Sequence, residues 1–372
     1  MKFAYGRQES NYVKGIAIIL MFYHHLFGFP FWIKSENMYR SLTIGGLNVQ
    51  LVIAAFCELC VGLYAFTTSY AMHVQREKYR SWKGRLSAAL HFLFKYWFVF
   101  LIFLILGALL GEPLPDWQTL LRQCFGYRTA TGYHWAYNTS IHPVFGWYVS
   151  FYLLFLALHP LLRRLSRWNF RADTVVCMAV LHGVYFALKA QRLVDISADV
   201  LSICKHFAVW GGVGMTGYLF AKYDIFSRMD AAVKKRVSSD RIVPLCALVL
   251  LAVFIVRSVH TALFWYSTAL DALYVPVFIY GAVTIIYNLK SKVPGEVLQK
   301  LSKQSLYMWF LHGIFFTPRA TVQFIAYFPQ YPALILAWTL ALTYFAAAGV
   351  QRLEDLLEKG LRAGVKHLER VK

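Results

Sequence analysis

Charged residues are scarce in this chain. They make up 15% of its 372 residues, whereas 59% are hydrophobic and 17% are aromatic. Soluble domains carry about 25% charged residues, so this composition excludes an ordinary soluble protein and indicates an integral membrane protein. Acidic residues are fewer than basic ones. The chain has 18 Asp and Glu and 38 Lys and Arg, which gives a formal net charge of +20.

Cysteines are also few. The six fall mostly inside apolar segments, including Cys57 and Cys60, the one pair with redox-motif spacing. We therefore expect no disulfide framework and no metal site. A basic excess of this size would suggest a nucleic-acid partner in a soluble protein. In a membrane protein it follows from cytoplasmic loops rich in Lys and Arg, so we expect no nucleic-acid partner.

Long apolar runs are what the chain has in abundance. About 20 apolar residues suffice to cross a bilayer as a helix, and charged or turn-rich breaks separate ten such spans. They cover residues 15–33, 47–72, 91–111, 145–162, 174–189, 200–221, 242–259, 266–288, 305–324 and 333–350. We therefore predict an all-α polytopic membrane protein with about ten transmembrane helices.

The distribution of basic residues predicts how these spans are oriented. If the N-terminus is cytoplasmic, the cytoplasmic segments hold 28 of the 38 Lys and Arg, and the opposite side holds eight. This bias follows the positive-inside rule, so we expect both termini in the cytoplasm and the protein in the inner (plasma) membrane. Residues 1–350 form the predicted transmembrane domain, and residues 351–372 form a basic amphipathic tail on the inner leaflet.

The first span carries the strongest candidate site. His24 and His25 lie deep in an otherwise apolar segment, where titratable side chains are costly unless they face protein or water. Lys14 and His25 are eleven positions apart, which places them within about 20° on one helix face and ~16 Å apart along its axis. His24 points about 100° away and is expected to pack between helices.

Acidic residues inside the spans also need partners. Glu58 lies near the middle of the second span, at a depth similar to that of His25. Two interpretations stay open: Glu58 orients and charges His25 or His24, or it pairs with another residue between helices. Asp271 and Arg257 lie in the external halves of their spans, where a charge pair could line a cavity.

Basic residues cluster at the cytoplasmic end of the third span. His91 and Lys95 lie one turn apart at its inner start, and the preceding segment adds Arg80, Lys83 and Arg85. Topology signalling accounts for part of this charge. The patch also predicts an anion site for a phosphorylated donor.

The ninth span contributes another imidazole, His312. Ser305 lies seven positions earlier, within about 20° of the same helix face. The external loop at 112–144 is long and rich in aromatic, amide and hydroxyl side chains. Such groups suit sugar rings, although Trp and Tyr also gather at membrane interfaces.

Taken in order, these motifs resemble the acyltransferase-3 family of integral membrane O-acyltransferases, which includes bacterial acetylases of surface polysaccharides and their precursor sugars. The first span is similar to that family's opening motif, a basic residue followed by ten residues and a histidine. Further similar motifs are Ser305, Leu306 and Tyr307 with His312, Trp147-Tyr148 entering the fourth span, and Gly217-Tyr218 to Lys222-Tyr223 ending the sixth. The family's opening basic residue is usually arginine, and Lys14 cannot form arginine's bidentate fork.

The resemblance implies acyl transfer from acyl-coenzyme A to a hydroxyl that is most often on a sugar. Acyl-CoA is then a co-substrate, and no bound cofactor is expected. The expected acyl group is acetyl. We expect His25 to deprotonate the acceptor hydroxyl or to carry the acyl group. Lys14 would bind donor phosphate or stabilise oxyanion charge, and Glu58 would support His25. The residues assigned to the acceptor side or to structure are His24, Trp147, Asp271, Ser305, Tyr307 and His312.

The expected partners are acyl-CoA, a sugar or polysaccharide acceptor and membrane lipid, and both a monomer and a homo-oligomer stay open. The alternative function is a secondary transporter or a lipid-linked sugar flippase. Such a protein would also need buried His, Glu and Lys side chains for proton coupling.

Overall fold

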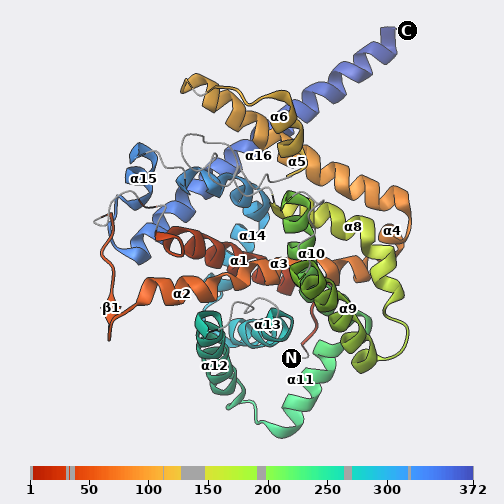
Figure 1. Cartoon of the computed structure of the whole chain (residues 1–372), viewed down its shortest axis with the longest axis vertical. Helices are drawn as coiled ribbons and strands as arrows, with labels where there is room; N and C mark the ends of the chain where they lie inside the picture. The colour runs from red at the N-terminus through yellow and green to blue at the C-terminus, as the bar shows by residue number, and fades with distance from the viewer. Residues whose placement is uncertain are drawn as a thin grey trace.

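The computed structural model describes residues 3–30, 33, 38–111, 113–126, 147–190, 198–263, 270–316 and 320–371 (Figure 1). Within these ranges the chain is almost entirely helical, apart from a hairpin of β1 (Thr43–Ile44) and β2 (Leu47–Asn48). The helices are α1 (Arg7–Phe27), α2 (Val49–Cys57), α3 (Leu59–Val74), α4 (Arg76–Arg80), α5 (Trp82–Leu109), α6 (Trp117–Cys124), α8 (Trp147–Arg164), α9 (Phe170–Ala190), α10 (Ala198–Lys222), α11 (Ile225–Arg236), α12 (Ile242–Leu263), α13 (Asp271–Asn288), α14 (Val293–Leu311), the 3-10 helix η3 (His312–Phe316), α15 (Ala320–Tyr327) and α16 (Pro332–Val371). The predicted helical class is confirmed.

Side-chain caps fix where two of the central helices begin. The Asn48 side chain accepts a hydrogen bond from Leu51 N at 3.2 Å at the start of α2. Ser81 Oγ accepts one from Gly84 N at 3.0 Å at the start of α5. Such caps satisfy N–H groups that the first helical turn leaves without partners. A polar residue directly before an apolar run therefore sets the first residue of each helix.

Each predicted apolar span overlaps with helical structure, but two of the spans are interrupted. The second divides at Glu58 into α2 and α3, and the ninth changes from α14 to η3 at His312. Five segments of the described chain are long and apolar enough to cross a membrane: Val49–Val74, Trp82–Leu109, Ile242–His260, Asp271–Asn288 and Pro332–Gly360. The chain is thus a helical membrane protein, while ten crossings and cytoplasmic termini stay predictions.

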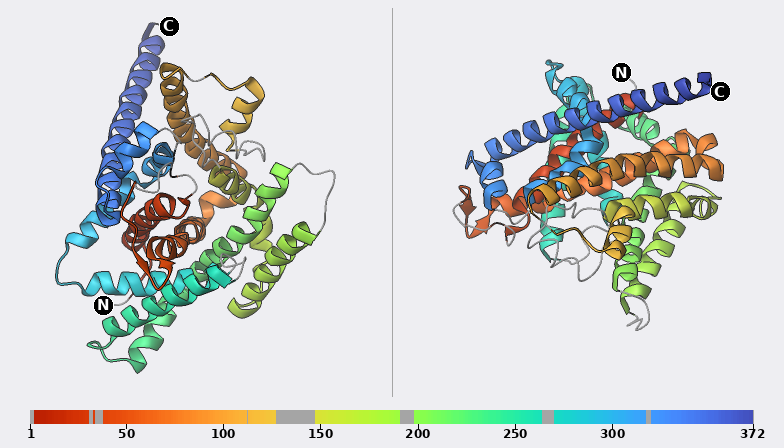
Figure 2. Two further views of the ribbon diagram at one scale, coloured as in Figure 1. Left: turned by 60° about the vertical axis from the view of Figure 1, so that its left-hand side comes forward. Right: turned by 90° about the horizontal axis from the view of Figure 1, so that it is seen from above.

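Helix α1 lies at the centre of the bundle, packed against α2, α3 and α14 (Figures 1 and 2). At Gly15 the backbone of α14 approaches so closely that a Cβ would clash with the carbonyl group of Leu298. α10 and α3 meet in the same way at Gly217, where a Cβ would clash with the carbonyl group of Phe66. Because small residues let helix backbones approach, these two glycines fix the spacing of the central helices.

The last helix, α16, runs without a break across the predicted domain boundary at residue 350. Figure 2 shows its C-terminal part projecting beyond the neighbouring helices. Leu353, Leu356 and Leu357 expose 46%, 61% and 51% of their surface. An exposed leucine stripe of this kind is typical of a helix that lies on lipid, and the membrane position of the tail stays a prediction.

Candidate active site

His25 lies half-buried in the last turn of α1. Its Nδ1 is 3.0 Å from the carbonyl oxygen of Met21, one turn earlier. Because a carbonyl oxygen only accepts hydrogen bonds, this contact assigns the proton of the neutral ring to Nδ1 and the lone pair to Nε2. Nε2 is therefore the atom of His25 that can accept a proton from a substrate or attack a carbonyl carbon.

A second imidazole lies beside His25. His312 begins η3 where α14 ends, and it is completely buried. Its ring centroid is 4.8 Å from that of His25. Its Nδ1 donates a hydrogen bond to the carbonyl oxygen of Trp309, so the basic nitrogen of this ring is also Nε2. The structure thus brings together two imidazoles that the sequence placed in the first and ninth spans.

Ser305 and Tyr307, which precede His312 on α14, have other contacts. The Ser305 hydroxyl donates to the carbonyl oxygen of Ser302 at 2.8 Å, within its own helix. The Tyr307 hydroxyl turns toward α5 and accepts a hydrogen bond from Lys95 Nζ at 2.9 Å. The seven-residue spacing therefore does not produce a hydrogen-bonded pair of Ser305 and His312, because the serine satisfies its hydroxyl on a nearby carbonyl.

Lys95, a predicted ligand of the donor, has a protein counterion. Its Nζ lies 3.0 Å from both carboxylate oxygens of Glu354 in α16. The Glu354 side chain is 3% exposed and the Lys95 side chain is 20% exposed. The pair joins α5 to α16, and with Tyr307 it also reaches α14. Lys95 therefore links three helices and is not an exposed cation of the predicted cationic patch.

The other residues of the predicted cationic patch lie at the end of α4 and in the first three turns of α5. Arg80, Lys83 and His91 are exposed. Arg85 uses its Nη1 to donate to the carbonyl oxygens of Tyr79 and Arg80 at 3.0 and 2.9 Å. These carbonyls belong to the last turn of α4, so Arg85 serves partly as a cap of that helix.

The break between α2 and α3 interrupts the helical hydrogen bonding in the middle of a span. Side chains from two other helices donate hydrogen bonds to the backbone carbonyl groups at the break. His24 Nδ1 donates to the carbonyl oxygen of Ala54 at 2.8 Å. Arg257 Nη1 donates to the carbonyl oxygens of Ala55 and Phe56, the latter at 3.1 Å. Backbone polar groups at membrane depth must find partners inside the protein. His24 and Arg257 therefore stabilise this interruption.

Arg257 also forms the ion pair that the sequence suggested. Its Nε and Nη2 donate to the two carboxylate oxygens of Asp271 at 2.8 and 2.9 Å, and both residues are completely buried. A carboxylate oxygen of Glu58 lies 3.6 Å from the same guanidinium. The pair joins α12 to the first turn of α13. Of the two interpretations left open for Glu58, the structure shows a contact with another residue, Arg257, and Glu58 also lies close enough to His24 to act on it electrostatically.

Lys14 lies eleven residues before His25 on α1. The Tyr64 hydroxyl of α3 is 3.5 Å from the Lys14 carbonyl oxygen. In the part of the chain that the structure describes, no carboxylate forms an ion pair with the Lys14 ammonium. A partly buried ammonium without a counterion favours an anionic ligand.

Comparison with known proteins decides the family. The model of the acyltransferase-3 family, described as an acyltransferase domain, matches residues 7–350, nearly the whole chain. The chain belongs to this family. Neither a curated protein nor a solved structure gave a match. The resemblance that the motifs suggested is confirmed, and the protein is a membrane acyltransferase.

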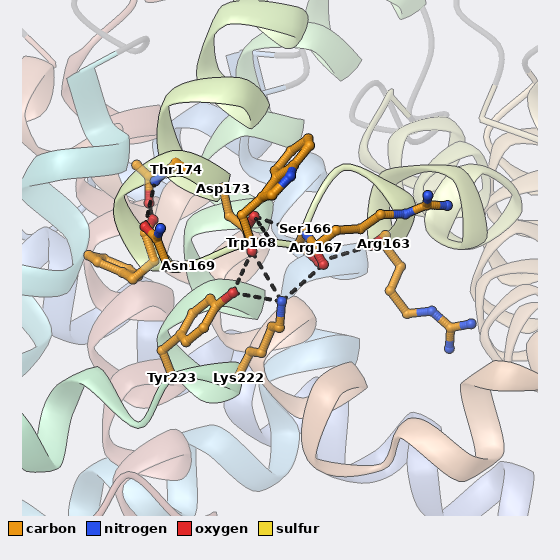
Figure 3. Close-up of polar contacts among 11 residues, drawn as sticks. Arg163, Ser166, Arg167, Trp168, Asn169, Asp173, Thr174, Lys222 and Tyr223 are labelled. Carbon is orange, nitrogen blue, oxygen red and sulfur yellow. Dashed lines mark hydrogen bonds and ion pairs between the residues drawn. The ribbon is translucent and has the colours of Figure 1, made fainter.

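In this acyltransferase, the Lys222-Tyr223 motif ends α10 beside Asp173, just outside the predicted fifth and sixth spans (Figure 3). Lys222 Nζ and the Tyr223 hydroxyl donate to Asp173 at 3.1 and 2.6 Å, and the Trp168 N–H donates at 2.9 Å. Burial alone would raise the pKa of Asp173, but these hydrogen bonds hold that pKa below its ordinary value. Burial alone would lower the pKa of Lys222, but Tyr223 and Asp173 raise it. The network ties α9 to the end of α10.

Two predictions about the acceptor side fall outside the described residues. Trp147 begins α8, but its side chain lies outside them, as does most of the aromatic loop at 112–144. Two contact residues were missed from the sequence, Glu354 and Asp173. A signal for both was present: acidic residues are few in this acyltransferase, so each one beside an apolar span predicts a basic partner.

Proposed function

We infer that this acyltransferase moves an acyl group, expected to be acetyl, from acyl-CoA on the cytoplasmic side to a hydroxyl of a sugar, a surface polysaccharide or its precursor. The observation that carries the proposal is the pairing of His25 with His312 at the centre of the bundle, with Nε2 as the basic atom of each ring. Membership of the acyltransferase family supplies the reaction class. The inner (plasma) membrane is the location that fits a cytoplasmic donor and a surface acceptor.

In the first route, His25 acts as a general base. Its Nε2 takes the proton of the acceptor hydroxyl while the hydroxyl oxygen attacks the thioester carbonyl carbon, so that a C–O bond forms. The C–S bond then breaks, and the proton passes from the imidazolium to the departing thiolate. CoA leaves as a thiol and the imidazole is neutral again. The hydrogen bond from Nδ1 to Met21 keeps the ring oriented in both steps.

In the second route, His25 carries the acyl group. Nε2 attacks the thioester carbon, the C–S bond breaks, and the CoA thiolate leaves and takes a proton from water. The acceptor hydroxyl then attacks the acyl carbon of the acyl-imidazolium, the C–N bond breaks, the hydroxyl proton is returned to water, and the neutral imidazole is restored. A burst of free CoA thiol before any acceptor is added identifies this route, whereas the general-base route releases thiol only when the acceptor is present.

Distance separates the two roles considered for Lys14. The rise along α1 between Lys14 and His25 is ~16 Å, and an extended lysine side chain reaches only about 6 Å. Side chains in a helix also lean toward its N-terminus, which takes the ammonium farther from His25. We therefore assign Lys14 to the phosphate groups of the donor rather than to the oxyanion that forms beside His25.

A glycan mass spectrum tests the proposal. Cells with and without the protein are compared, and the expected difference is one acetyl group on a surface glycan or its precursor. Purified protein in sealed vesicles then receives labelled acetyl-CoA on one face and the identified acceptor on the other. Label on the acceptor supports the proposal, and identical spectra with no labelled product in vesicles contradict it.

The transporter alternative has one specific observation in its favour. Two spans are interrupted at membrane depth, at Glu58 and at His312, and discontinuous helices are typical of transporter binding sites. Family membership favours acyl transfer. Accumulation of a sugar substrate in vesicles that contain no acyl donor would support transport instead.

A further inference from the structure

A second group of imidazole and guanidinium side chains lies where α3, α8 and α10 end on the predicted cytoplasmic side. His73 is in the last turn of α3, and His159 and Arg163 are one turn apart near the end of α8. The Tyr218 ring of α10 lies between the imidazoles, with centroids 4.9 Å from His73 and 5.7 Å from His159. Three helices thus bring four side chains with hydrogen-bond donors to one place.

Two nitrogen atoms in this group are buried without a partner. His159 is 3% exposed, and its Nε2 has no hydrogen-bond partner among the residues that the structure describes. The same holds for Nδ1 of His73 within the described ranges. Buried polar atoms in folded proteins nearly always have a partner. Two orphan nitrogens on rings that both pack against Tyr218 therefore indicate a position that a polar ligand occupies.

The charge around these rings indicates that the ligand is an anion. Arg163 and Arg85 lie close enough to act electrostatically on His159, and Arg76 does so on His73. No carboxylate in the described part of the chain pairs with Arg163 or Arg85. Figure 3 shows the Arg163 guanidinium pointing away from Asp173, the nearby carboxylate that Lys222 neutralises. Arginine is the side chain best suited to phosphate, because its planar fork matches two oxygens.

We propose that Arg163, His159, His73 and Tyr218 bind the 3′-phosphate of the CoA donor, a deduction that rests on the proposed function. The position fits the length of the donor. Tyr64, which lies against Lys14, precedes His73 on α3 by nine residues, or ~14 Å. A donor whose terminal phosphate lies here can extend past Lys14 toward His25 with its diphosphate and its thioester arm.

The matched pair Arg163→Gln and Arg164→Gln tests the proposal. The two residues are adjacent on α8, but Arg164 is exposed and lies outside the group. Full-length protein in nanodiscs of neutral phosphatidylcholine is titrated with CoA and with dephospho-CoA, which lacks the 3′-phosphate. Wild type and Arg164→Gln should bind CoA at least tenfold more tightly than dephospho-CoA. Arg163→Gln and His159→Gln should bind both equally, with unchanged melting temperatures.

Three results would overturn the assignment, and they differ from one another. Equal loss of CoA affinity in Arg163→Gln and Arg164→Gln would show a general charge effect and leave acyl-CoA dependence intact. Displacement of CoA by phosphatidylglycerol in wild type but not in Arg163→Gln would give the position to a lipid headgroup. Failure of wild type both to bind CoA and to transfer acyl groups from acetyl-CoA would end the proposed function together with this inference.

Discussion

The ion pair of Arg257 with Asp271 allows a quantitative test of what holds the break between α2 and α3 in place. Arg257→Met leaves the Asp271 carboxylate buried without its counterion, a loss that costs about 3–5 kcal/mol. It also removes a donor from the carbonyl oxygens of Ala55 and Phe56. Phe56 keeps the backbone N–H of Glu58, so the Ala55 carbonyl is the one that loses its donor, at a cost of about 1–3 kcal/mol.

The companion variants separate these contributions. Asp271→Asn keeps one acceptor oxygen for the guanidinium, so its expected cost is about 3 kcal/mol, the low end for one lost partner. The double variant Arg257→Met with Asp271→Leu removes both charges of the pair and leaves only the Ala55 carbonyl without its donor, at a cost of about 1–3 kcal/mol. Arg257→Met alone should therefore be the least stable of the three, and the second substitution should partly restore it.

Thermal unfolding in nanodiscs measures the order, at about 2 °C per kcal/mol for a protein of this size. Arg241→Met is the matched control, because the Arg241 side chain is 82% exposed and lies 4.0 Å from the Asp240 carboxylate. Exposed ion pairs contribute at most about 1 kcal/mol. This variant should therefore change the melting temperature by less than about 2 °C. A double variant as stable as wild type would refute the reasoning, since the Ala55 carbonyl would then need no donor.

Three further outcomes are expected. Lys14→Met should raise the KM for acetyl-CoA at least tenfold and Lys14→Arg should largely retain activity, because either cation can hold phosphate; steady-state kinetics with varied acetyl-CoA measures this. Glu354→Gln should lower stability by about 1–3 kcal/mol, and Lys95→Met in the same chain should recover part of the loss in thermal unfolding. Asp173→Asn should cost about 2–3 kcal/mol at pH 7. The pKa of Asp173 is lowered in the folded protein. The difference in unfolding free energy between wild type and this variant should therefore persist above about pH 4 and disappear as the pH falls through the lowered pKa. An equal difference at both ends of the pH range would contradict the ion pair.

The helices follow directly from the sequence, but the interruption at Glu58 does not. Apolar runs long enough to span a bilayer predict helices whatever the order of their residues. Glu58 interrupts its run without a glycine or proline beside it, whereas His312 is followed directly by Gly313, a residue common where an α-helix ends. The break at Glu58 forms because His24 and Arg257 supply donors for the freed carbonyl groups. Those donors come from other helices, so local sequence holds no signal for them.

Within the site, local geometry was predictable and distant pairing was not. Helical periodicity correctly placed Lys14 and His25 on one element, and the apolar surroundings singled out the imidazoles. The partner of Lys95 is Glu354, which is 259 residues away in the sequence. The partner of Glu58 is Arg257 in α12. Choosing among several buried charges requires knowledge of which helices are neighbours, and a single sequence does not supply it. The meeting of His25 with His312 depends on the same knowledge.

The central claim is that His25 performs the acyl transfer. Its most direct test compares His25→Gln with His182→Gln, using labelled acetyl-CoA and the acceptor in vesicles. His182 on α9 makes the same kind of hydrogen bond, from Nδ1 to the carbonyl oxygen of Met178 at 2.9 Å, but lies away from the site. We predict that His25→Gln folds normally and loses at least 100-fold in transfer rate, as removal of a general base entails, while His182→Gln keeps wild-type activity. Transfer by His25→Gln at the wild-type rate would contradict the account.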